Sequence, residues 1–297
     1  DGLHPSIAGY RAMADAVPLA LLAWTATQGG EGAAPAPAIA ITFDDLPVHA
    51  ALPPGVTRLQ IARQIAAALN DAKAPAIGFV NGNGLAREPG SGAALDAWRA
   101  AGLTLGNHGW SHANLDALSD AEFVREVAEN EPVLQARMGG ADWHWFRYPF
   151  LSEGRDERRG AIRRVLAGRG YKVASVTMGF DDWAYGDAYA RCTRKGDAGG
   201  VARLEAAWMA AAEAEADRSR RMAQTLYGRD IPQVLLLHIG ALDARMMPRL
   251  LAMYRAKGFR FVTLEEAQRD PHYRAENDST LPPPPQGLDG ALAARNL

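Results

Sequence analysis

From residue 38 onward, short β-forming runs alternate with longer segments of helical periodicity, and this alternation constrains the fold most. The runs lie near 38 to 43, 76 to 80, 103 to 106, 144 to 147, 171 to 177, 232 to 237 and 260 to 263. The helical segments lie near 58 to 72, 92 to 101, 119 to 137, 156 to 168, 185 to 225 and 242 to 257. Such alternation predicts a parallel sheet with helices outside it. About seven strands in roughly 230 residues suit a barrel, although periodicity alone does not choose it over an open sheet.

Ionisable residues gather where several of these strands are expected to end. Asp44 and Asp45 follow the first run, and two histidines four residues apart, His108 and His112, follow the third. In a β/α barrel the C-terminal ends of the strands form the active-site face. Together these residues supply a base and three ligands, because one Asp and two neutral imidazoles can hold a divalent cation and leave positions open for water and substrate.

Five segments carry a resemblance to a known family. In chain order they are Thr42-Phe43-Asp44-Asp45, His108 to His112, Arg147-Tyr148-Pro149-Phe150, Asp182-Trp183 and Leu235-Leu236-Leu237-His238. They resemble the five motifs of the polysaccharide deacetylases, also called the NodB-homology family or carbohydrate esterase family 4. The resemblance spans residues 38 to 265 and implies an α/β fold, specifically a distorted (β/α)7 barrel. Two positions depart from the family pattern, since Gly109 replaces a hydroxyl residue and Gly179 replaces an aspartate.

The resemblance assigns Asp45, His108 and His112 to one divalent transition metal. Zinc is expected, and cobalt, nickel and manganese are alternatives because a site of one Asp and two His accepts each of them. Outside the family context, two histidines at this spacing are more often surface residues. An Asp-Asp pair at a strand end is often only a polar end.

The resemblance also implies a base and an acid. Asp44 would take a proton from the metal-activated water, and Arg147 would orient and charge-pair it. His238 would protonate the leaving amine or alcohol, and Asp182 would keep that imidazole protonated and oriented. In isolation, a histidine after an apolar strand is more often buried and neutral.

Three further residues are assigned to the substrate. The backbone N–H of Phe150 would donate to the oxyanion of the tetrahedral intermediate. Trp183 and Leu235 would form the apolar wall around the acetyl methyl group. On sequence alone, Trp183 and Leu235 are core residues more often than pocket residues, and the motif context reverses that reading.

Bulk composition excludes several classes of protein. The 297 residues are 48% hydrophobic and 22% charged, which is ordinary for a globular protein. A formal net charge of -2 gives no reason to expect a nucleic-acid partner. The single cysteine, Cys192, excludes an intramolecular disulfide and a Cys-based zinc site. The apolar stretch from Val17 to Trp24 is too short to span a bilayer.

Both ends of the chain differ from the barrel pattern. Asp1 to Tyr10 resembles the last block of the SGNH (GDSL-type) hydrolases, but no serine nucleophile motif follows, so an ordinary N-terminal helix is the alternative. We therefore divide the chain into an N-terminal helical extension at 1–27, a linker at 28–37, the deacetylase domain at 38–270 and a Pro-rich C-terminal tail at 271–297. The tail is expected to be surface-hugging or partly disordered.

Taken together, the sequence predicts a metal-dependent hydrolase that removes acetyl groups, as N-acetyl amide or O-acetyl ester, from an oligo- or polysaccharide. The alternatives are a non-catalytic carbohydrate-binding module on the same barrel, a fragment of a bifunctional esterase and deacetylase with an upstream SGNH domain, and a serine esterase. No membrane span is expected. Polymeric substrates and the family habit favour a periplasmic or extracellular location.

Overall fold

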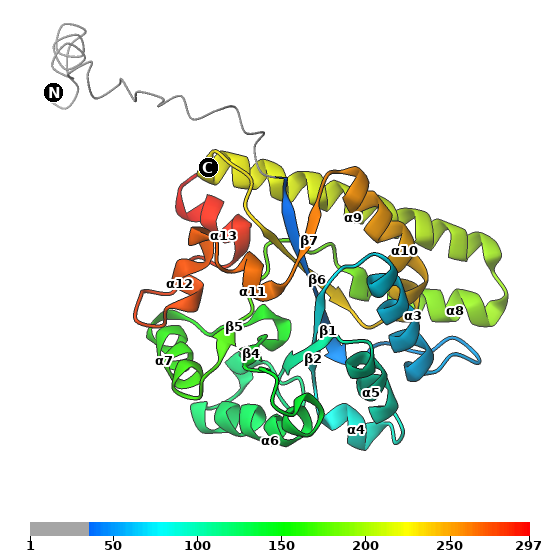
Figure 1. Ribbon diagram of the computed structural model, residues 1–297, viewed down its shortest axis with the longest axis horizontal. Coiled ribbons are helices and arrows are strands. Elements are labelled where there is room, and N and C mark those ends of the chain that lie inside the picture. The colour runs from blue at the N-terminus through cyan, green and yellow to red at the C-terminus, as the bar shows by residue number, and fades with distance from the viewer. Residues whose placement is uncertain (1–35) are drawn as a thin grey trace, which may run out of the picture. The chain divides into compact units, whose positions relative to one another are not determined.

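Seven parallel strands lie at the centre of the computed structural model, which describes residues 36–297 (Figure 1). The strands are β1 (Ala38–Leu46), β2 (Ala76–Val80), β3 (Thr104–Asn107), β4 (Trp145–Phe146), β5 (Lys172–Val173), β6 (Gln233–His238) and β7 (Arg260–Val262). Each predicted strand is present, although β5 is shorter than the run from 171 to 177. The predicted N-terminal extension and most of the predicted linker lie outside the described residues.

The strands curl into a ring. They follow the order β5-β4-β3-β2-β1-β6, and β7 pairs with the first half of β1. The ring closes where the chain beyond β5 meets β6, because Met178 bridges Leu235 and the Leu236 N–H donates to the Met178 carbonyl at 2.9 Å. The expected distorted β/α barrel is therefore confirmed.

Helices surround this ring (Figure 1). The longer ones are α3 (Arg58–Asp71), α5 (Gly92–Ala100), α6 (Asp120–Met138), α7 (Asp156–Gly168), α8 (Gly186–Lys195), α9 (Ala198–Tyr227), α10 (Ala241–Ala256) and α13 (Gly287–Ala294). Shorter turns are α4 (Asn83–Arg87), α11 (Leu264–Ala267) and α12 (Arg274–Asn277), with 3₁₀ turns η1 (Leu115–Ala117), η2 (Pro149–Leu151), η3 (Asp182–Tyr185) and η4 (Pro271–Tyr273). The predicted helices agree with the longer ones to within a few residues, whereas the sequence reading missed α4 and the helices after β7.

Alternation along the strands sorts the core into an outer and an inner part. Ile39, Ile41 and Phe43 of β1 belong to the larger hydrophobic cluster, which includes buried residues of α3, α5 and α10. Ala38 and Ala40 belong to a smaller cluster drawn mainly from the strands. Successive side chains of a strand point to opposite faces, so the even-numbered residues of β1 face the barrel interior.

The polar C-terminal segment follows the surface of the barrel. Tyr273 and Leu288 are buried, and Leu288 packs with Met222 and Leu226 of α9. The Arg159 guanidinium of α7 also donates to the Pro284 carbonyl at 2.5 Å. These contacts place α13 against α9. The division of the chain at residue 270 stays a prediction.

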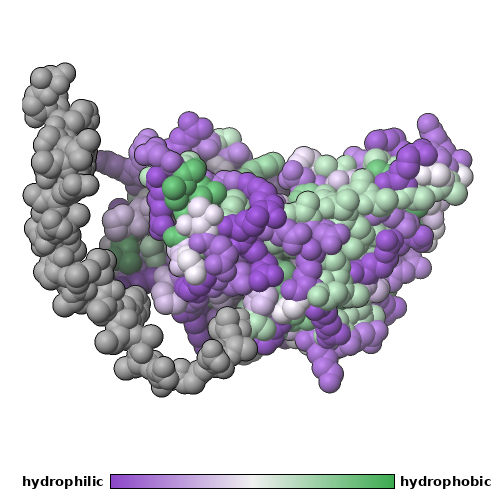
Figure 2. Space-filling model, turned by 90° about the horizontal axis from the view of Figure 1, so that it is seen from above, coloured by the Kyte–Doolittle hydropathy of each residue, from purple (hydrophilic) through white to green (hydrophobic). Residues whose placement is uncertain are grey.

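Within residues 36–297, no helix has the length and apolarity needed to cross a membrane. On the face shown in Figure 2, hydrophilic residues cover much of the surface, and moderately hydrophobic residues are interspersed among them.

A buried asparagine ties α6 to the ends of two strands. Asn130 donates to the Val80 carbonyl at 2.6 Å and to Asn107 Oδ1 at 2.8 Å, and it accepts from the Gly82 N–H at 2.9 Å. Its side chain is fully buried. The three contacts satisfy polar groups where β2 and β3 end, and so fix the segments that follow these strands.

Replacing this asparagine should destabilise the fold. In Asn130→Ala, the Gly82 N–H stays buried without a partner and the Val80 carbonyl keeps only the bond from the His108 N–H, so we expect the free energy of unfolding to fall by about 1–3 kcal/mol. Chemical denaturation followed by circular dichroism measures the change. Glu129→Ala, an exposed position on the same helix, is the control, and an equal loss in both variants contradicts the role given to Asn130.

Candidate active site

Two consecutive aspartates reach the same cavity at the end of β1. Regular alternation would point Asp44 and Asp45 to opposite faces of the strand. The pairing of β1 with β2 is irregular between Phe43 and Leu46, and Asp45 has a left-handed backbone with φ of 66°. This local change of direction lets both carboxylates line one cavity.

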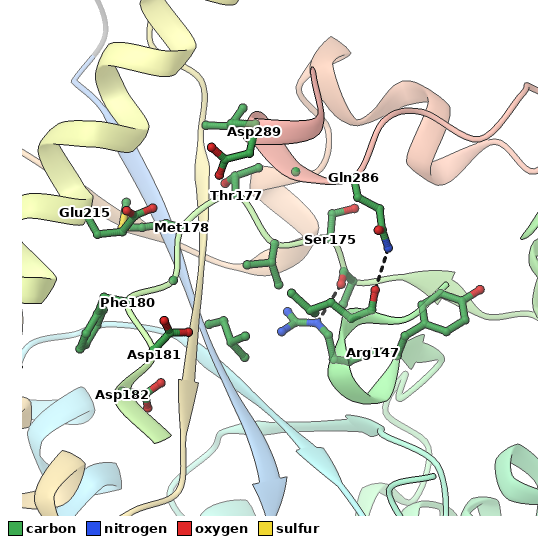
Figure 3. A pocket seen from close by; sticks show the side chains of 18 of the residues that line it. Arg147, Ser175, Thr177, Met178, Phe180, Asp181, Asp182, Glu215, Gln286 and Asp289 are labelled. Carbon is green, nitrogen blue, oxygen red and sulfur yellow. Dashed lines mark hydrogen bonds between the residues drawn. The ribbon is translucent and has the colours of Figure 1, made fainter. Parts of the chain in front are cut away.

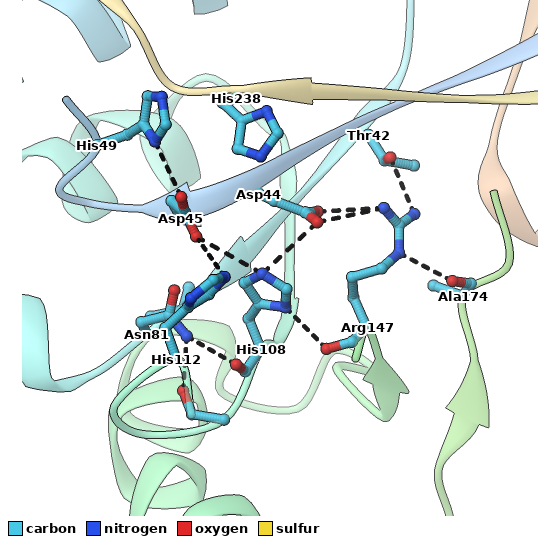
Figure 4. Close-up of polar contacts among 12 residues, drawn as sticks. Thr42, Asp44, Asp45, His49, Asn81, His108, His112, Arg147, Ala174 and His238 are labelled. Atoms are coloured by element: carbon cyan, nitrogen blue, oxygen red, sulfur yellow. Dashed lines mark hydrogen bonds and ion pairs between the residues drawn. The ribbon is translucent and has the colours of Figure 1, made fainter. Parts of the chain in front are cut away.

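Asp45, His108 and His112 form a cluster with the donor set of a metal site (Figure 4). One ligand atom from each lies within 4.8 Å of the others. Asp45 Oδ1 is 3.6 Å from His108 Nε2 and 3.3 Å from His112 Nε2. That carboxylate oxygen is buried and has no hydrogen-bond partner. An unpartnered buried oxygen facing two imidazole nitrogens fits a divalent cation, so the predicted ligands do come together.

The surroundings of both histidines prepare them to act as ligands. His108 Nδ1 lies 2.7 Å from the Arg147 carbonyl, which can only accept, so Nδ1 carries the proton and Nε2 keeps its lone pair. Burial, followed by the charge of His108, lowers the pKa of His112, although the two aspartates raise it. The imidazole of His112 is therefore neutral at neutral pH and free to coordinate.

His49, which the sequence reading left structural, belongs to the site. Its Nδ1 lies 2.9 Å from Asp45 Oδ2, so one oxygen of Asp45 is held by His49 and the other faces the two ligand histidines. Burial alone would raise the pKa of Asp45, but the His49 hydrogen bond and the charges of nearby histidines lower it well below its usual range. No motif at the sequence level marks His49, and only the path of the loop after β1 brings it here.

Arg58 and Glu88 hold that loop in place. The Arg58 guanidinium donates to the carbonyls of His49 and Ala50. It also pairs with the Glu88 carboxylate at 2.8 Å. Two backbone carbonyls of the loop are thereby fixed to α3, which positions His49.

The histidine loop is held without a hydroxyl at position 109. Gly109 has φ of 74°, which glycine adopts at little cost. Asn81 donates to the carbonyls of His108 and Gly109 at 2.7 and 3.0 Å. Two residues on, Ser111 donates through its N–H and its hydroxyl to Glu126 of α6 at 2.7 and 2.8 Å. Asn81 and Glu126 therefore hold the loop although residue 109 has no hydroxyl.

Asp44 pairs with Arg147 inside the barrel, as predicted. Nη1 of Arg147 lies 3.2 and 3.4 Å from the two oxygens of Asp44, and both side chains are buried. The guanidinium also donates to Thr42 Oγ1 at 3.0 Å and to the Ala174 carbonyl at 2.8 Å (Figure 4). It lies over the Phe79 ring, 4.8 Å from its centroid. Asp44 Oδ2 is 3.5 Å from His108 Nε2, so this carboxylate lies beside the candidate metal ligands.

His238, which lines the same cavity, pairs with the buried Asp182. Asp182 Oδ2 accepts from the His238 backbone N–H at 2.6 Å, and Oδ1 lies 3.0 Å from His238 Nδ1. Burial alone would lower the pKa of His238, but the charge and hydrogen bond of Asp182, with the charges of Asp44 and Asp45, raise it to about 9. The imidazole is therefore protonated at neutral pH. Asp181, the neighbouring aspartate, is exposed and does not make this contact.

The cavity that contains these groups has a volume of about 460 Å³ and apolar residues at its mouth. Phe150 and Trp183 line it and are 64% and 53% exposed, so both aromatic rings are open to solvent. The Phe150 ring packs against His112 at 4.5 Å between centroids. The prediction for Leu235 is wrong, because this side chain is fully buried in the outer cluster and Leu236 lines the cavity instead. Strand alternation explains the difference, since 236 and 238 share a face.

A second cavity, of about 320 Å³, adjoins the first (Figure 3). Leu151, Asp181, Trp183 and Leu236 line both. Residues of α9 and α13, among them Glu215 and Asp289, form its far wall. The Gln286 amide donates to the Leu151 carbonyl at 2.7 Å, which connects the C-terminal segment to the loop that contains Phe150. The C-terminal segment thus contributes to the surroundings of the site.

Comparisons with known proteins find one matching family model and several solved structures with the same fold. Residues 31–174 match the family model described as polysaccharide deacetylase. No curated protein matches the chain. A family 4 carbohydrate esterase from Streptomyces lividans, in complex with acetate, is 19% identical with a TM-score of 0.51, over 79% of this chain and 97% of that chain.

Two other solved structures share the fold. The peptidoglycan deacetylase PdaC from Bacillus subtilis, in a mutant form, is 21% identical with a TM-score of 0.51, over 80% of this chain and 94% of that chain. BA3943 from Bacillus anthracis, described as a CE4 family pseudoenzyme, is 14% identical with a TM-score of 0.54, over 78% of this chain and 66% of that chain. The fold is therefore found both in deacetylases and in a pseudoenzyme.

His49 should matter for metal affinity although it is not placed as a ligand. His49→Ala removes the hydrogen bond that orients Asp45, and we expect zinc affinity to fall about 10- to 100-fold. Titration calorimetry with zinc measures the change. His144→Ala, whose imidazole contacts Asp142 instead, is the control. If zinc affinity is the same in His49→Ala and the wild-type protein, His49 does not support the ligand set.

Proposed function

The chain belongs to the polysaccharide deacetylase family, and on this premise we propose that it is a metal-dependent hydrolase removing acetyl groups from a carbohydrate. One observation carries the proposal. The cluster of Asp45, His108 and His112 lies beside the pair of Asp44 and Arg147, in a cavity that also contains the protonated His238. A cation site, a base and an acid in one cavity are what hydrolysis of an amide or ester requires.

Asp44 is proposed as the general base. A divalent cation held by Asp45, His108 and His112 would supply Lewis-acid chemistry, which polarises a carbonyl group and acidifies water. Asp44 lies next to this site, and Arg147 fixes the orientation of its carboxylate. A carboxylate held in this way can accept a proton from an attacking water without having to reorganise.

His238 is proposed as the general acid. Its Nδ1 faces Asp182, so Nε2 is the nitrogen that can donate a proton to the leaving amine or alcohol. The neighbouring carboxylates keep the imidazole charged at neutral pH. Acid and base are then separate groups, and the His238 imidazole begins the reaction with the proton that its role requires.

Phe150 and Trp183 are proposed to bind the substrate. The Phe150 N–H would donate to the oxyanion, and its left-handed backbone, with φ of 58°, is the kind of strained conformation often found at functional sites. Trp183, with Leu236, would pack against the acetyl group and the sugar. Exposed aromatic rings at the mouth of the cavity suit the apolar faces of sugar rings.

The substrate is proposed to be an acetylated oligo- or polysaccharide, carrying either an N-acetyl amide or an O-acetyl ester. Zinc is the proposed metal, because Asp and His ligands suit it. A polymeric substrate of this kind lies outside the cytoplasm, which supports a periplasmic or extracellular location.

A non-catalytic carbohydrate-binding protein is the second candidate, and it is favoured by the likeness to a solved pseudoenzyme. The residues argue for the first candidate. Binding a saccharide needs neither a buried base paired with Arg147 nor an imidazole held protonated by Asp182.

Acetate release from a panel of acetylated glycans tests the function. We expect release that EDTA abolishes and that zinc or cobalt restores. In Asp44→Asn we expect zinc to remain bound while kcat falls about 100- to 10,000-fold, because an amide cannot accept the proton. Asp96→Asn, at an exposed position on α5, should behave as the wild-type protein does. Saccharide binding without any acetate release across the panel, with zinc bound, favours the binding protein.

The pH dependence of kcat tests the acid. His238 must be protonated to act, so activity should fall as the pH rises through its pKa, near 9 in the metal-free protein. A bound cation lowers that value, so the informative measurement compares variants with the same metal. Asp182→Asn removes the charge that raises the pKa of His238, and we expect the alkaline limb to move to lower pH by about one to three units. An unmoved limb contradicts the assignment of His238.

A further inference from the structure

A buried carboxyl group that the proposed mechanism does not use lies behind the pair of His238 and Asp182. Asp243 is in the first turn of α10, and only 2% of its surface is exposed. It lies outside the five segments that resemble the family motifs. A carboxyl group so deeply buried needs partners for both oxygens, because an unpartnered polar group in the interior is costly.

The surroundings of Asp243 supply one acceptor and one donor. Its carboxyl group shares a hydrogen bond with the Asp182 carboxylate. Its buried Oδ1 has no hydrogen-bond partner among the described residues, and the buried indole N–H of Trp208 on α9 lies close to the carboxyl group. Its Oδ2 leaves no room for a Cβ atom at residue 240, which is glycine. The glycine at position 240 therefore leaves the space that the Asp243 carboxyl group occupies.

Only a neutral Asp243 satisfies this arrangement. Two ionised carboxylates have no proton to share and repel each other, whereas a carboxylic acid donates one hydrogen bond and accepts another. Burial, followed by the charge of Asp182, raises the pKa of Asp243 well above its usual value. The same contact, with the bonds from His238, lowers the pKa of Asp182 despite its burial. The proton therefore resides on Asp243.

We propose that Asp243 is a positioning residue whose carboxylic acid donates a hydrogen bond to Asp182 and so fixes Asp182 against His238. This inference rests on the proposed function of His238 as the acid. Asp182 accepts from the His238 backbone N–H and faces Nδ1 of the same residue. The donor on Asp243 adds a contact from α10. The Asp182 carboxylate is then held from both sides and cannot rotate away from the imidazole.

The hydrogen bond also tunes the acid. A donor that stabilises the Asp182 carboxylate withdraws negative charge from it, so less remains to stabilise the protonated imidazole. Asp243 therefore limits how far Asp182 raises the pKa of His238. From other elements, the carboxylates of Asp44 and Asp45 at the end of β1 act on His238, and the imidazole of His49 packs against its ring at 4.8 Å between centroids. None of the three is hydrogen-bonded to Asp243.

Two substitutions separate the donor from the shape of the side chain. Asp243→Asn keeps a donor, because its amide N–H can replace the acid O–H, whereas Asp243→Leu has a similar volume and no donor. In the zinc-loaded protein we expect the Asn variant to keep kcat within about threefold of wild type and the Leu variant to lose about 10- to 100-fold, with KM and zinc affinity unchanged. In the Leu variant, histidine NMR should show His238 titrating at higher pH than in the wild-type protein.

Infrared spectroscopy tests the proton itself and needs no activity. The wild-type protein should show the carbonyl band of a neutral carboxylic acid at pH values well above 7, and Asp243→Asn should lack it. Measuring at high pH avoids a band from Glu276, because burial and the charge of Glu153 raise the pKa of Glu276 to about 7. Glu276→Gln is the matched control and should keep the band. This result stands even if no acetylated glycan is hydrolysed, so it is independent of the proposed function.

Three results would overturn the proposal. The wild-type protein could lack the acid band, Asp243→Asn could impair kcat as much as Asp243→Leu, or the Leu variant could leave both kcat and the titration of His238 unchanged. If the Leu variant does not fold, the infrared band and the activity of the Asn variant still decide the matter.

Discussion

The left-handed backbone of Asp45 is the constraint on which the candidate site depends. A regular strand would leave Asp44 and Asp45 on opposite faces of β1, one inside the barrel and one under the helices. The irregularity between Phe43 and Leu46 turns the second carboxylate back to the cavity. One carboxylate can then face the histidines while its neighbour stays paired with Arg147. A single departure from strand geometry thus separates a candidate ligand from a candidate base that are adjacent in sequence.

The barrel interior supports this arrangement with a buried cation. Arg147 is fully buried, and its guanidinium contacts Asp44, Thr42 and the Ala174 carbonyl. Its own carbonyl accepts from His108 Nδ1, so the same residue orients the candidate base through its side chain and a candidate ligand through its backbone. Pairing and hydrogen bonds to β1 and to the segment after β5 are what make a buried charge tolerable. The closed ring of strands and the geometry of the site are therefore coupled.

The fold and most of the candidate site residues were predictable from the sequence, because the patterns that indicate them are short motifs or periodic runs. Alternating strands and helices predicted the barrel, and polar residues at strand ends predicted the groups that meet there. Leu235 shows the limit. Motif context assigned both Trp183 and Leu235 to the acetyl pocket, and Trp183 does line the cavity, but the register of β6 puts Leu236 there and buries Leu235. His49 shows another limit, since its approach to Asp45 depends on a loop held by Arg58, a contact that no spacing rule contains. The family model matches residues 31–174, so it ends before Asp182 and His238, and the fold brings His238 back to the same cavity.

The buried ionisable groups at this end of the barrel add little to the stability of the fold, but they are the groups that the proposed function needs. Asp44 with Arg147, and Asp182 with His238, remove charges from water, and such pairs are often no more stabilising than apolar residues of the same volume. A fold selected only for stability would have little reason to keep them. Their cost is limited by sharing partners, because Asp182 satisfies both the backbone and the ring of His238, and Arg147 serves Asp44 and His108 together. Buried groups that are mutually satisfied in this way are rigid, and rigidity is what holds a base, an acid and a ligand set at fixed distances from one another.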